Sequence, residues 1–232
     1  MLLLLAVRHL GRVAHPVISL APLRIPTFAK STFAAGTYSM LCLHATPYLL
    51  PLTFQLGFGA SAAVAGAMML PYFLGTLLMK SATTPVLRRF GFKRVLIVDG
   101  ILAMVFIGLC GVIDAHTPYL VLIAVLVVAG AARSMLFTTL NTLCFADVEP
   151  AERAAAATLS SVSMLLAQSL GIVVSTLVLA GAKAASGHAQ LGAGEFRIAF
   201  FAVCAIGLAS VALYAGLPEH IGAEVRGRAS PS

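Results

Sequence analysis

Long apolar segments alternate with short polar connections along this chain. One segment runs from Tyr119 to Phe145 and contains a single charged residue, Arg133. At about 1.5 Å of rise per residue, a helix of that length exceeds the roughly 30 Å hydrocarbon core of a bilayer. The segments do not alternate strictly between apolar and polar residues, so helices are predicted rather than strands. We predict six spans, over residues 31–54, 61–85, 95–113, 119–145, 154–182 and 196–217.

Composition agrees with this pattern. The chain has 232 residues, of which 60% are hydrophobic and 10% charged, and its mean hydropathy is +1.00. Soluble domains usually carry about 25% charged residues. The predicted fold class is therefore an all-α polytopic membrane protein, embedded in the lipid bilayer through six transmembrane helices. Residues 1–30 are expected to form a cytoplasmic N-terminal segment, and residues 218–232 a cytoplasmic tail.

The net charge of +7 and its distribution predict which side of the membrane each connection occupies. With the N-terminus placed inside, the connections on the inner side hold eleven basic residues, and those on the outer side hold only Lys183 and Arg197. An excess of Lys and Arg on the cytoplasmic side orients membrane proteins, so both termini are predicted to be cytoplasmic. Because the basic residues gather in connections and do not alternate with aromatic residues, nucleic acid is not an expected partner. The inner residues are Arg8, Arg12, Arg24, Lys30, Arg88, Arg89, Lys93, Arg94, Arg153, Arg226 and Arg228.

Arg133 is the first candidate for function. Near the middle of a bilayer an arginine costs about 2.5–3.5 kcal/mol, so the side chain should point into a helix bundle, a cavity or a pathway. The helical period places Arg133 on one stripe with Phe137 and Asn141, a combination that suits a cavity wall. The alternative interpretation is a structural anchor, in which the guanidinium binds helix carbonyls or reaches toward the cytoplasm.

Three further polar residues lie within predicted spans. Lys80, near the inner end of its span, can extend its long side chain to the interface. His44 could respond to a proton gradient, or it could simply bind a neighbouring helix. Gln168 could line a cavity, although it lies beside a stripe of small residues that favours close helix packing. Arg88, Arg89 and Asp99 are expected as charges at the inner side.

Other chemistry is not indicated. No carboxylate is predicted at mid-membrane depth, where proton-driven transporters usually place one. The four cysteines fall in different apolar segments without metal-ligand spacing, and they are expected to be packing residues. The sequence contains no catalytic, phosphate-binding or dinucleotide-binding motif. It therefore predicts no enzyme activity, no cofactor and no metal.

Four stretches of the chain form a recognisable set: HPVISLAPLRIPTF (15–28), LLPLTFQLGFGASAAVAG (49–66), LLMKSATTPVLRRFGFKRVL (77–96) and RSMLFTTLNTLCFADV (133–148). Together they resemble the C-terminal half of a major facilitator superfamily transporter, of the 14-span drug:proton antiporter type. The resemblance covers most of residues 15–217. The loop departs from the general superfamily pattern, because no acidic residue precedes Arg89-Phe90-Gly91.

The resemblance implies one six-helix half of a twelve-helix core in a bacterial plasma (inner) membrane. It implies multidrug efflux, in which a small hydrophobic or amphipathic substrate leaves by antiport with the proton as coupling ion. Arg133, Asn141 and Lys80 match the family pattern. The substrate site of such folds lies between two halves. We therefore expect this chain to be a fragment of such a carrier, one member of a split pair with a separate N-terminal half, or a subunit of a homodimer. The alternative is a truncated non-transporting protein or an interaction module of a full-length carrier.

Overall fold

The computed structural model describes residues 19–216, and the regular structure within that range is entirely helical. The predicted segments that include residues 1–18 and 217–232 extend outside it. The short elements are of three kinds. The 3-10 helices are η1 (Ala21–Arg24) and η4 (Pro150–Glu152), the π-helices are η2 (Lys30–Ala34) and η3 (Thr53–Gly57), and the short α-helices are α2 (Pro26–Ala29) and α4 (Ala62–Met68). The long helices are α3 (Ala35–Leu52), α5 (Leu70–Phe90), α6 (Phe92–Cys110), α7 (Tyr119–Cys144), α8 (Arg153–Ser186) and α9 (Ala193–Ala215).

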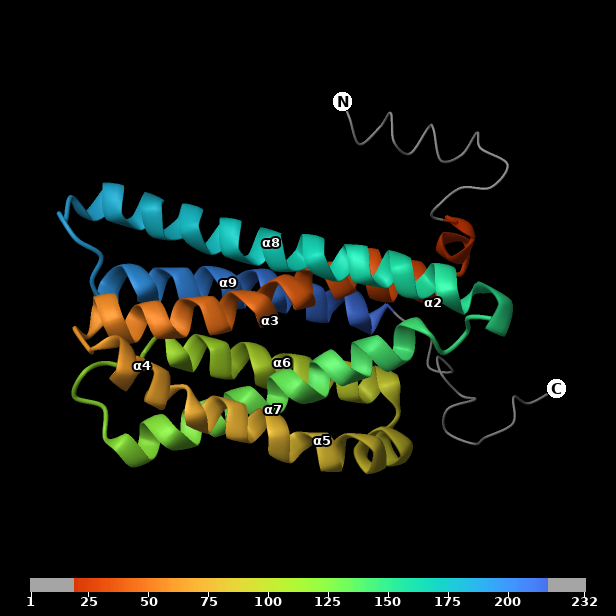
Figure 1. Ribbon diagram of the computed structural model, residues 1–232, viewed down its shortest axis with the longest axis horizontal. Coiled ribbons are helices and arrows are strands. Elements are labelled where there is room, and N and C mark those ends of the chain that lie inside the picture. Colours follow the sequence, from red (N-terminus) through yellow and green to blue (C-terminus); the bar gives the residue numbers. More distant parts are fainter. Residues whose placement is uncertain (1–18, 217–232) are drawn as a thin grey trace.

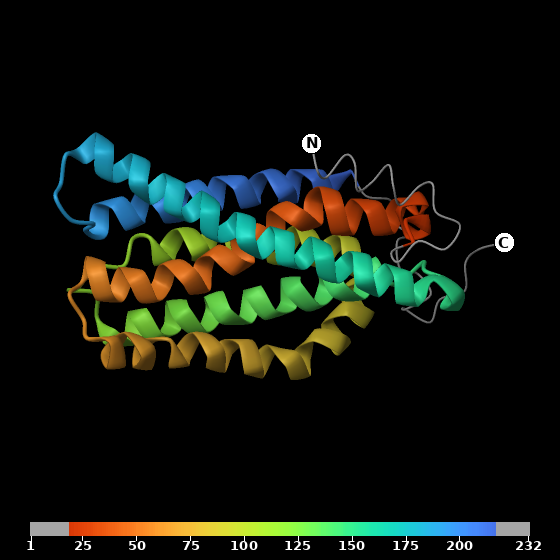
Figure 2. The ribbon, with the colours of Figure 1, turned by 45° about the horizontal axis from the view of Figure 1, so that its top comes forward.

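The long helices lie side by side as a bundle in which successive helices run in opposite directions (Figure 1). Helix α3 packs between α8 and α9, whereas α7 packs against both α5 and α6. The turned view shows the same order (Figure 2). The α5–α6 turn, the α7–α8 connection and α2 share one end of the bundle, and the α8–α9 turn lies at the other. Arg88, Arg89 and Arg153 therefore collect at one end, away from Lys183.

Four helical stretches of the described chain are long and apolar enough to cross a membrane: Ala62–Phe90, Tyr119–Cys144, Pro150–Ser186 and Ala193–Ala215. Helix α3 has only 18 residues and is made more polar by His44 and two prolines, and α6 carries Lys93, Arg94 and Asp99. The all-helical membrane class is confirmed, while the count of six crossings stays a prediction.

Helix α5 extends further than the sequence indicated. The predicted span ended at Pro85, but the helix continues to Phe90, where Gly91 ends it with a φ of 77°. Glycine adopts this left-handed conformation without the steric penalty of a side chain. Lys80, expected one turn from the helix end, consequently lies ten residues before it, with an exposed side chain.

Small residues bring α8 close to α3. Ala167, Gly171 and Ser175 of α8 are all buried, and a Cβ added at Gly171 would meet the carbonyl of Leu41 on α3. Successive residues four apart lie on one helix face, so the three form a continuous contact stripe. The predicted close packing of this stripe is confirmed.

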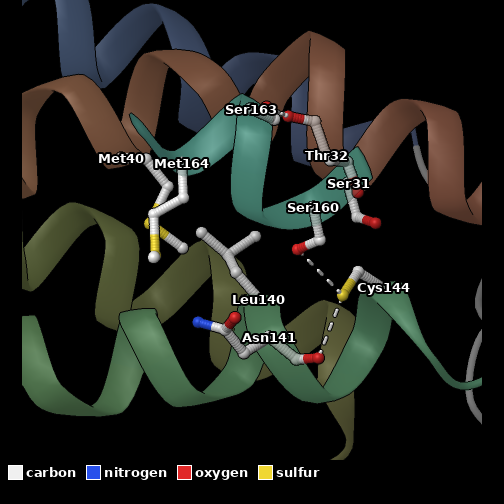
Figure 3. Close-up of a pocket in the computed structure, with 9 residues that line it drawn as sticks. All are labelled: Ser31, Thr32, Met40, Leu140, Asn141, Cys144, Ser160, Ser163 and Met164. Atoms are coloured by element: carbon white, nitrogen blue, oxygen red, sulfur yellow. Dashed lines mark hydrogen bonds between the residues drawn. The ribbon is translucent and has the colours of Figure 1, made fainter. Parts of the chain in front are cut away.

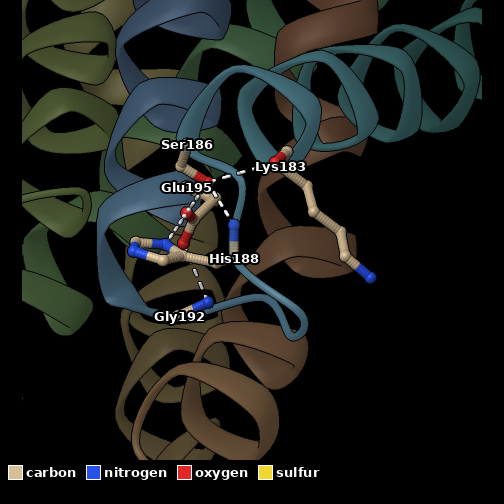
Figure 4. Close-up of polar contacts among 5 residues, drawn as sticks. All are labelled: Lys183, Ser186, His188, Gly192 and Glu195. Atoms are coloured by element: carbon tan, nitrogen blue, oxygen red, sulfur yellow. Dashed lines mark hydrogen bonds and ion pairs between the residues drawn. The ribbon is translucent and has the colours of Figure 1, made fainter.

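The α8–α9 turn is closed by Glu195, which is only 3% exposed (Figure 4). One carboxylate oxygen accepts a hydrogen bond from Ser186 Oγ and lies 2.7 Å from His188 Nδ1, and the other accepts from the Gly192 N–H at 2.9 Å. Glu195 thereby caps the start of α9 and holds the end of α8 against it. It forms, with His188, the only ion pair found within residues 19–216.

Candidate functional site

The site centres on Arg133 of α7, whose side chain is half-buried in the bundle. Its Nε donates a hydrogen bond of 3.1 Å to the carbonyl oxygen of Leu43 on α3. In a regular helix that carbonyl would accept the N–H of the residue four positions later. That residue is Pro47, which has no N–H. Arg133 therefore binds an acceptor that the helix itself leaves unoccupied, and this bond links α7 to α3.

A tight contact between α5 and α7 lies one turn before Arg133 on α7. A Cβ added at Gly130 would meet the Tyr72 carbonyl of α5, and one added at Gly75 would meet the Val127 carbonyl of α7. Thr76 Oγ1 lies 3.1 Å from the carbonyl oxygens of both Tyr72 and Gly130, so its single proton is shared between the two helices. Helix α7 is thus fixed on α5 at Gly130 and bonded to α3 at Arg133.

Two polar atoms near Arg133 have no hydrogen-bond partner among the described residues, although both are buried. They are His44 Nε2 and the Tyr72 hydroxyl. Arg133 is close enough to interact electrostatically with both side chains. A buried polar atom without a partner is costly in a packed interior, and such atoms often mark a place where water, an ion or a ligand binds. Sequence reasoning selected His44 but missed Tyr72, which directly follows Pro71 in a helix that otherwise reads as apolar.

Phe137 and Asn141 continue the stripe one and two turns beyond Arg133, and both are partly exposed. Asn141 Nδ2 donates to the Phe137 carbonyl at 2.9 Å, so its amide is oriented by its own helix. Asn141 and Met40 also line a cavity of about 20 Å³, enough for one water molecule. Figure 3 shows this cavity between α7, α8 and the π-helical turn η2. The Thr32 hydroxyl, which lines it, is buried without a hydrogen-bond partner in the described chain.

The structure places the remaining candidate residues apart from Arg133 and the neighbouring side chains described above, which together are called the Arg133 group. Gln168 is exposed on the outer face of α8, and Lys80, Arg88 and Arg89 are exposed on α5. Asp99, expected near the end of its helix, lies two turns inside α6 and is 8% exposed. Sequence reasoning did not anticipate that burial. Helix α6 also begins three residues earlier than predicted, which places Asp99 deeper within the helix.

The chemistry available at this site is binding and conformational change. No group of three His, Cys, Asp or Glu side chains suited to a metal gathers in the part of the chain that the structure describes. Cys42, Cys110, Cys144 and Cys204 are all free thiols. Arg133 offers hydrogen-bond donors in addition to the one that Leu43 accepts, and Phe137 offers an aromatic surface. A half-buried guanidinium beside an aromatic ring and an amide suits a wall along a polar pathway.

An all-helical bundle, in which four stretches of the described chain are long and apolar enough to cross a membrane, defines the class as an integral membrane protein. The particular family follows from comparison with known proteins: residues 32–230 match the Major Facilitator Superfamily. This match covers most of the sequence, so the chain belongs to the Major Facilitator Superfamily of membrane transporters. The predicted family is confirmed.

The names of two curated relatives refer to multidrug resistance and to transport. The chain is 34% identical over 181 residues to "Putative multidrug resistance protein MdtD" of Cronobacter sakazakii, covering 75% of this chain and 37% of that protein. It is 29% identical over 181 residues to "Probable transport protein HsrA" of Haemophilus influenzae, covering 76% of this chain and 39% of that protein. The chain thus spans less than two fifths of the length of these relatives.

Proposed function

We propose that this chain supplies one half of a carrier that exports amphipathic small molecules across a bacterial inner membrane. The observation that carries the proposal is the hydrogen bond from Arg133 to Leu43. Pro47 has already removed the helical donor of that carbonyl, so Arg133 binds it without competition from a backbone N–H and joins α7 to α3. A polar bond between two helices of the bundle can stabilise one of the states between which a carrier alternates.

In this proposal Arg133 holds α3 and α7 together in one state of the carrier. Phe137 and Asn141 continue the same stripe as a wall for the substrate, and His44 adjoins the Leu43 acceptor. Family membership and the names of the relatives support transport of small molecules. Because the chain spans less than two fifths of those relatives, we propose that transport requires an N-terminal half of the fold or a second copy of this chain.

The test is export of a fluorescent amphipathic dye from a bacterial host that lacks its own pumps. The chain is produced alone and together with the N-terminal portion of the Cronobacter sakazakii relative. We expect energised export that a protonophore abolishes, since protons are the proposed coupling ion. Arg133→Gln should slow export about tenfold, because a hydrogen bond to a charged group contributes about 1.5–3 kcal/mol.

Arg197→Gln is the matched control, because Arg197 also donates to a carbonyl, that of Gly111 at 3.4 Å, but lies outside the Arg133 group. The proposal would be defeated if export were absent both from cells that produce the chain alone and from cells that also produce the N-terminal portion of the relative. An Arg133 variant that changed only abundance or binding to a full-length carrier would instead identify an interaction module.

We also propose that both termini are cytoplasmic, because basic residues collect at the bundle end that carries the α5–α6 turn and α2 (Figure 1). Reporter fusions after residue 91 and after residue 187 test this orientation. The first should behave as cytoplasmic and the second as external. The reverse result would contradict it.

A further inference from the structure

A second cavity lies away from Arg133, between α5 and α6. Its volume is about 330 Å³, within the range of small-ligand sites. These two consecutive helices barely touch each other and instead pack on α7 and, for α6, also on α9. Met79 and Val86 of α5 and Leu102 of α6 form apolar walls, and Met135 of α7 also lines the cavity. Met135 follows Arg133 by two residues, so the helical period directs it to the opposite side of α7.

Asp99 is the acidic group in this cavity. The side chain is more than nine-tenths buried, and its Oδ2 has no hydrogen-bond partner in the described chain. Transferring a carboxylate into an apolar interior is costly unless a counter-charge or hydrogen bonds compensate for the lost water. The apolar walls supply neither, so the cavity combines a buried carboxyl group, whose Oδ2 lacks a partner in the described chain, with a large apolar surface.

Arg94 also lines the cavity, but it does not compensate Asp99. The arginine is exposed, and the two side chains form no ion pair in the structure. The exposed cation at the rim repels any positively charged ligand, and it repels one with two positive charges more strongly than one with a single charge.

We infer that this cavity binds a small amphipathic monocation, whose ammonium group pairs with Asp99 while its apolar body fills the space between α5 and α6. The inference concerns equilibrium binding and does not rest on the proposed export. It also defines a site separate from the Arg133 group, because Met135, which lines the cavity, lies on the opposite side of α7 from Arg133.

The experiment measures binding of 4-phenylbutylamine to the full chain in lipid nanodiscs, with empty nanodiscs as background and 4-phenylbutanol as the uncharged ligand of the same shape. We expect saturable binding of one amine per chain, with the alcohol bound at least about tenfold more weakly. Asp99→Asn should weaken amine binding by at least about tenfold, the loss expected for one charge-assisted contact. Asp147→Asn is the matched control, because that carboxylate is exposed just beyond the end of α7.

Two further variants test whether the amine occupies the cavity itself. Leu102→Trp leaves the carboxylate in place but fills the cavity, so this variant should also lose binding of the amine. Because Leu102 is 41% exposed, the larger side chain is compatible with folding. Arg94→Gln should preserve or strengthen binding. Equal binding of the alcohol, an unchanged affinity in Asp99→Asn, or a loss of binding in Arg94→Gln would each overturn the inference. Circular dichroism and size-exclusion chromatography confirm that each variant is folded.

Discussion

Arg133 on α7 donates its Nε–H to the carbonyl of Leu43 on α3, the acceptor that Pro47 deprives of its own helical donor. Two features that look unfavourable separately compensate each other here. The guanidinium obtains a carbonyl inside an apolar bundle, and the carbonyl obtains a donor that proline cannot supply. The pairing explains how α3 tolerates a proline and α7 an arginine at positions far apart in the chain.

This pairing predicts a specific coupling between Arg133 and Pro47. Arg133→Ala should destabilise the protein more in the natural background than in Pro47→Ala, where the restored N–H at position 47 satisfies Leu43. We expect a coupling energy of about 1 kcal/mol. Equilibrium unfolding in mixed micelles of the two single variants and the double variant measures it. Arg197→Ala combined with Pro47→Ala serves as the control and should be additive; additivity of the Arg133 pair would contradict the geometry.

The α5–α7 contact predicts opposite effects for two glycines. Gly130→Ala should destabilise the bundle by about 1–3 kcal/mol, since the new methyl group meets the backbone of Tyr72, which cannot move aside. Gly181→Ala in α8 meets nothing within 4 Å and should stabilise its helix by about 0.5–1 kcal/mol. Thermal denaturation in detergent compares the two. Equal effects would show that α5 and α7 can separate at Gly130 without cost.

Glu195 should control the order of the α8–α9 turn. Glu195→Ala removes the acceptor shared by Ser186, His188 and the Gly192 N–H, so amides 187–195 should exchange faster with solvent. His188→Ala is the comparison, because that ring is 67% exposed and should contribute little to the turn. Hydrogen–deuterium exchange followed by mass spectrometry measures both. A larger effect from the histidine would reverse the assigned roles.

The α6–α7 loop predicts a local dependence on pH. Hydrogen bonds from the His116 N–H and the Thr117 hydroxyl hold the pKa of Asp114 below its ordinary value. A lowered pKa means that the charged carboxylate stabilises the loop above the unfolded-state pKa, and that this contribution disappears as pH falls through the folded-state pKa. Protection of the His116 amide should therefore decrease on acidification. Asp114→Asn should lack this transition, and an identical profile in the variant would exclude Asp114 as its cause.

Much of the helical framework follows from the sequence, because apolar segments in a bilayer must satisfy their own backbone hydrogen bonds. The ends were less predictable. Pro85 suggested the end of a helix, yet α5 continues to Phe90, and the left-handed conformation of Gly91 stops it. That extension moved Lys80 deeper into its helix, and the earlier start of α6 did the same for Asp99. A proline within a helix has a local cost, which packing against α7 can offset.

By itself the sequence determined the helical class, the family, and the clustering of basic residues near the ends of the apolar segments, since all three depend on residue type and local order. It also identified Arg133 as a cation within an apolar span, in contrast to the residue types around it. Only the tertiary structure decided that Arg133 meets the carbonyl that Pro47 leaves free, that Gly130 contacts Tyr72, and that Asp99 lies in a cavity. Those relationships join helices distant in the chain, and side-chain packing between helices, which no local pattern encodes, selects them.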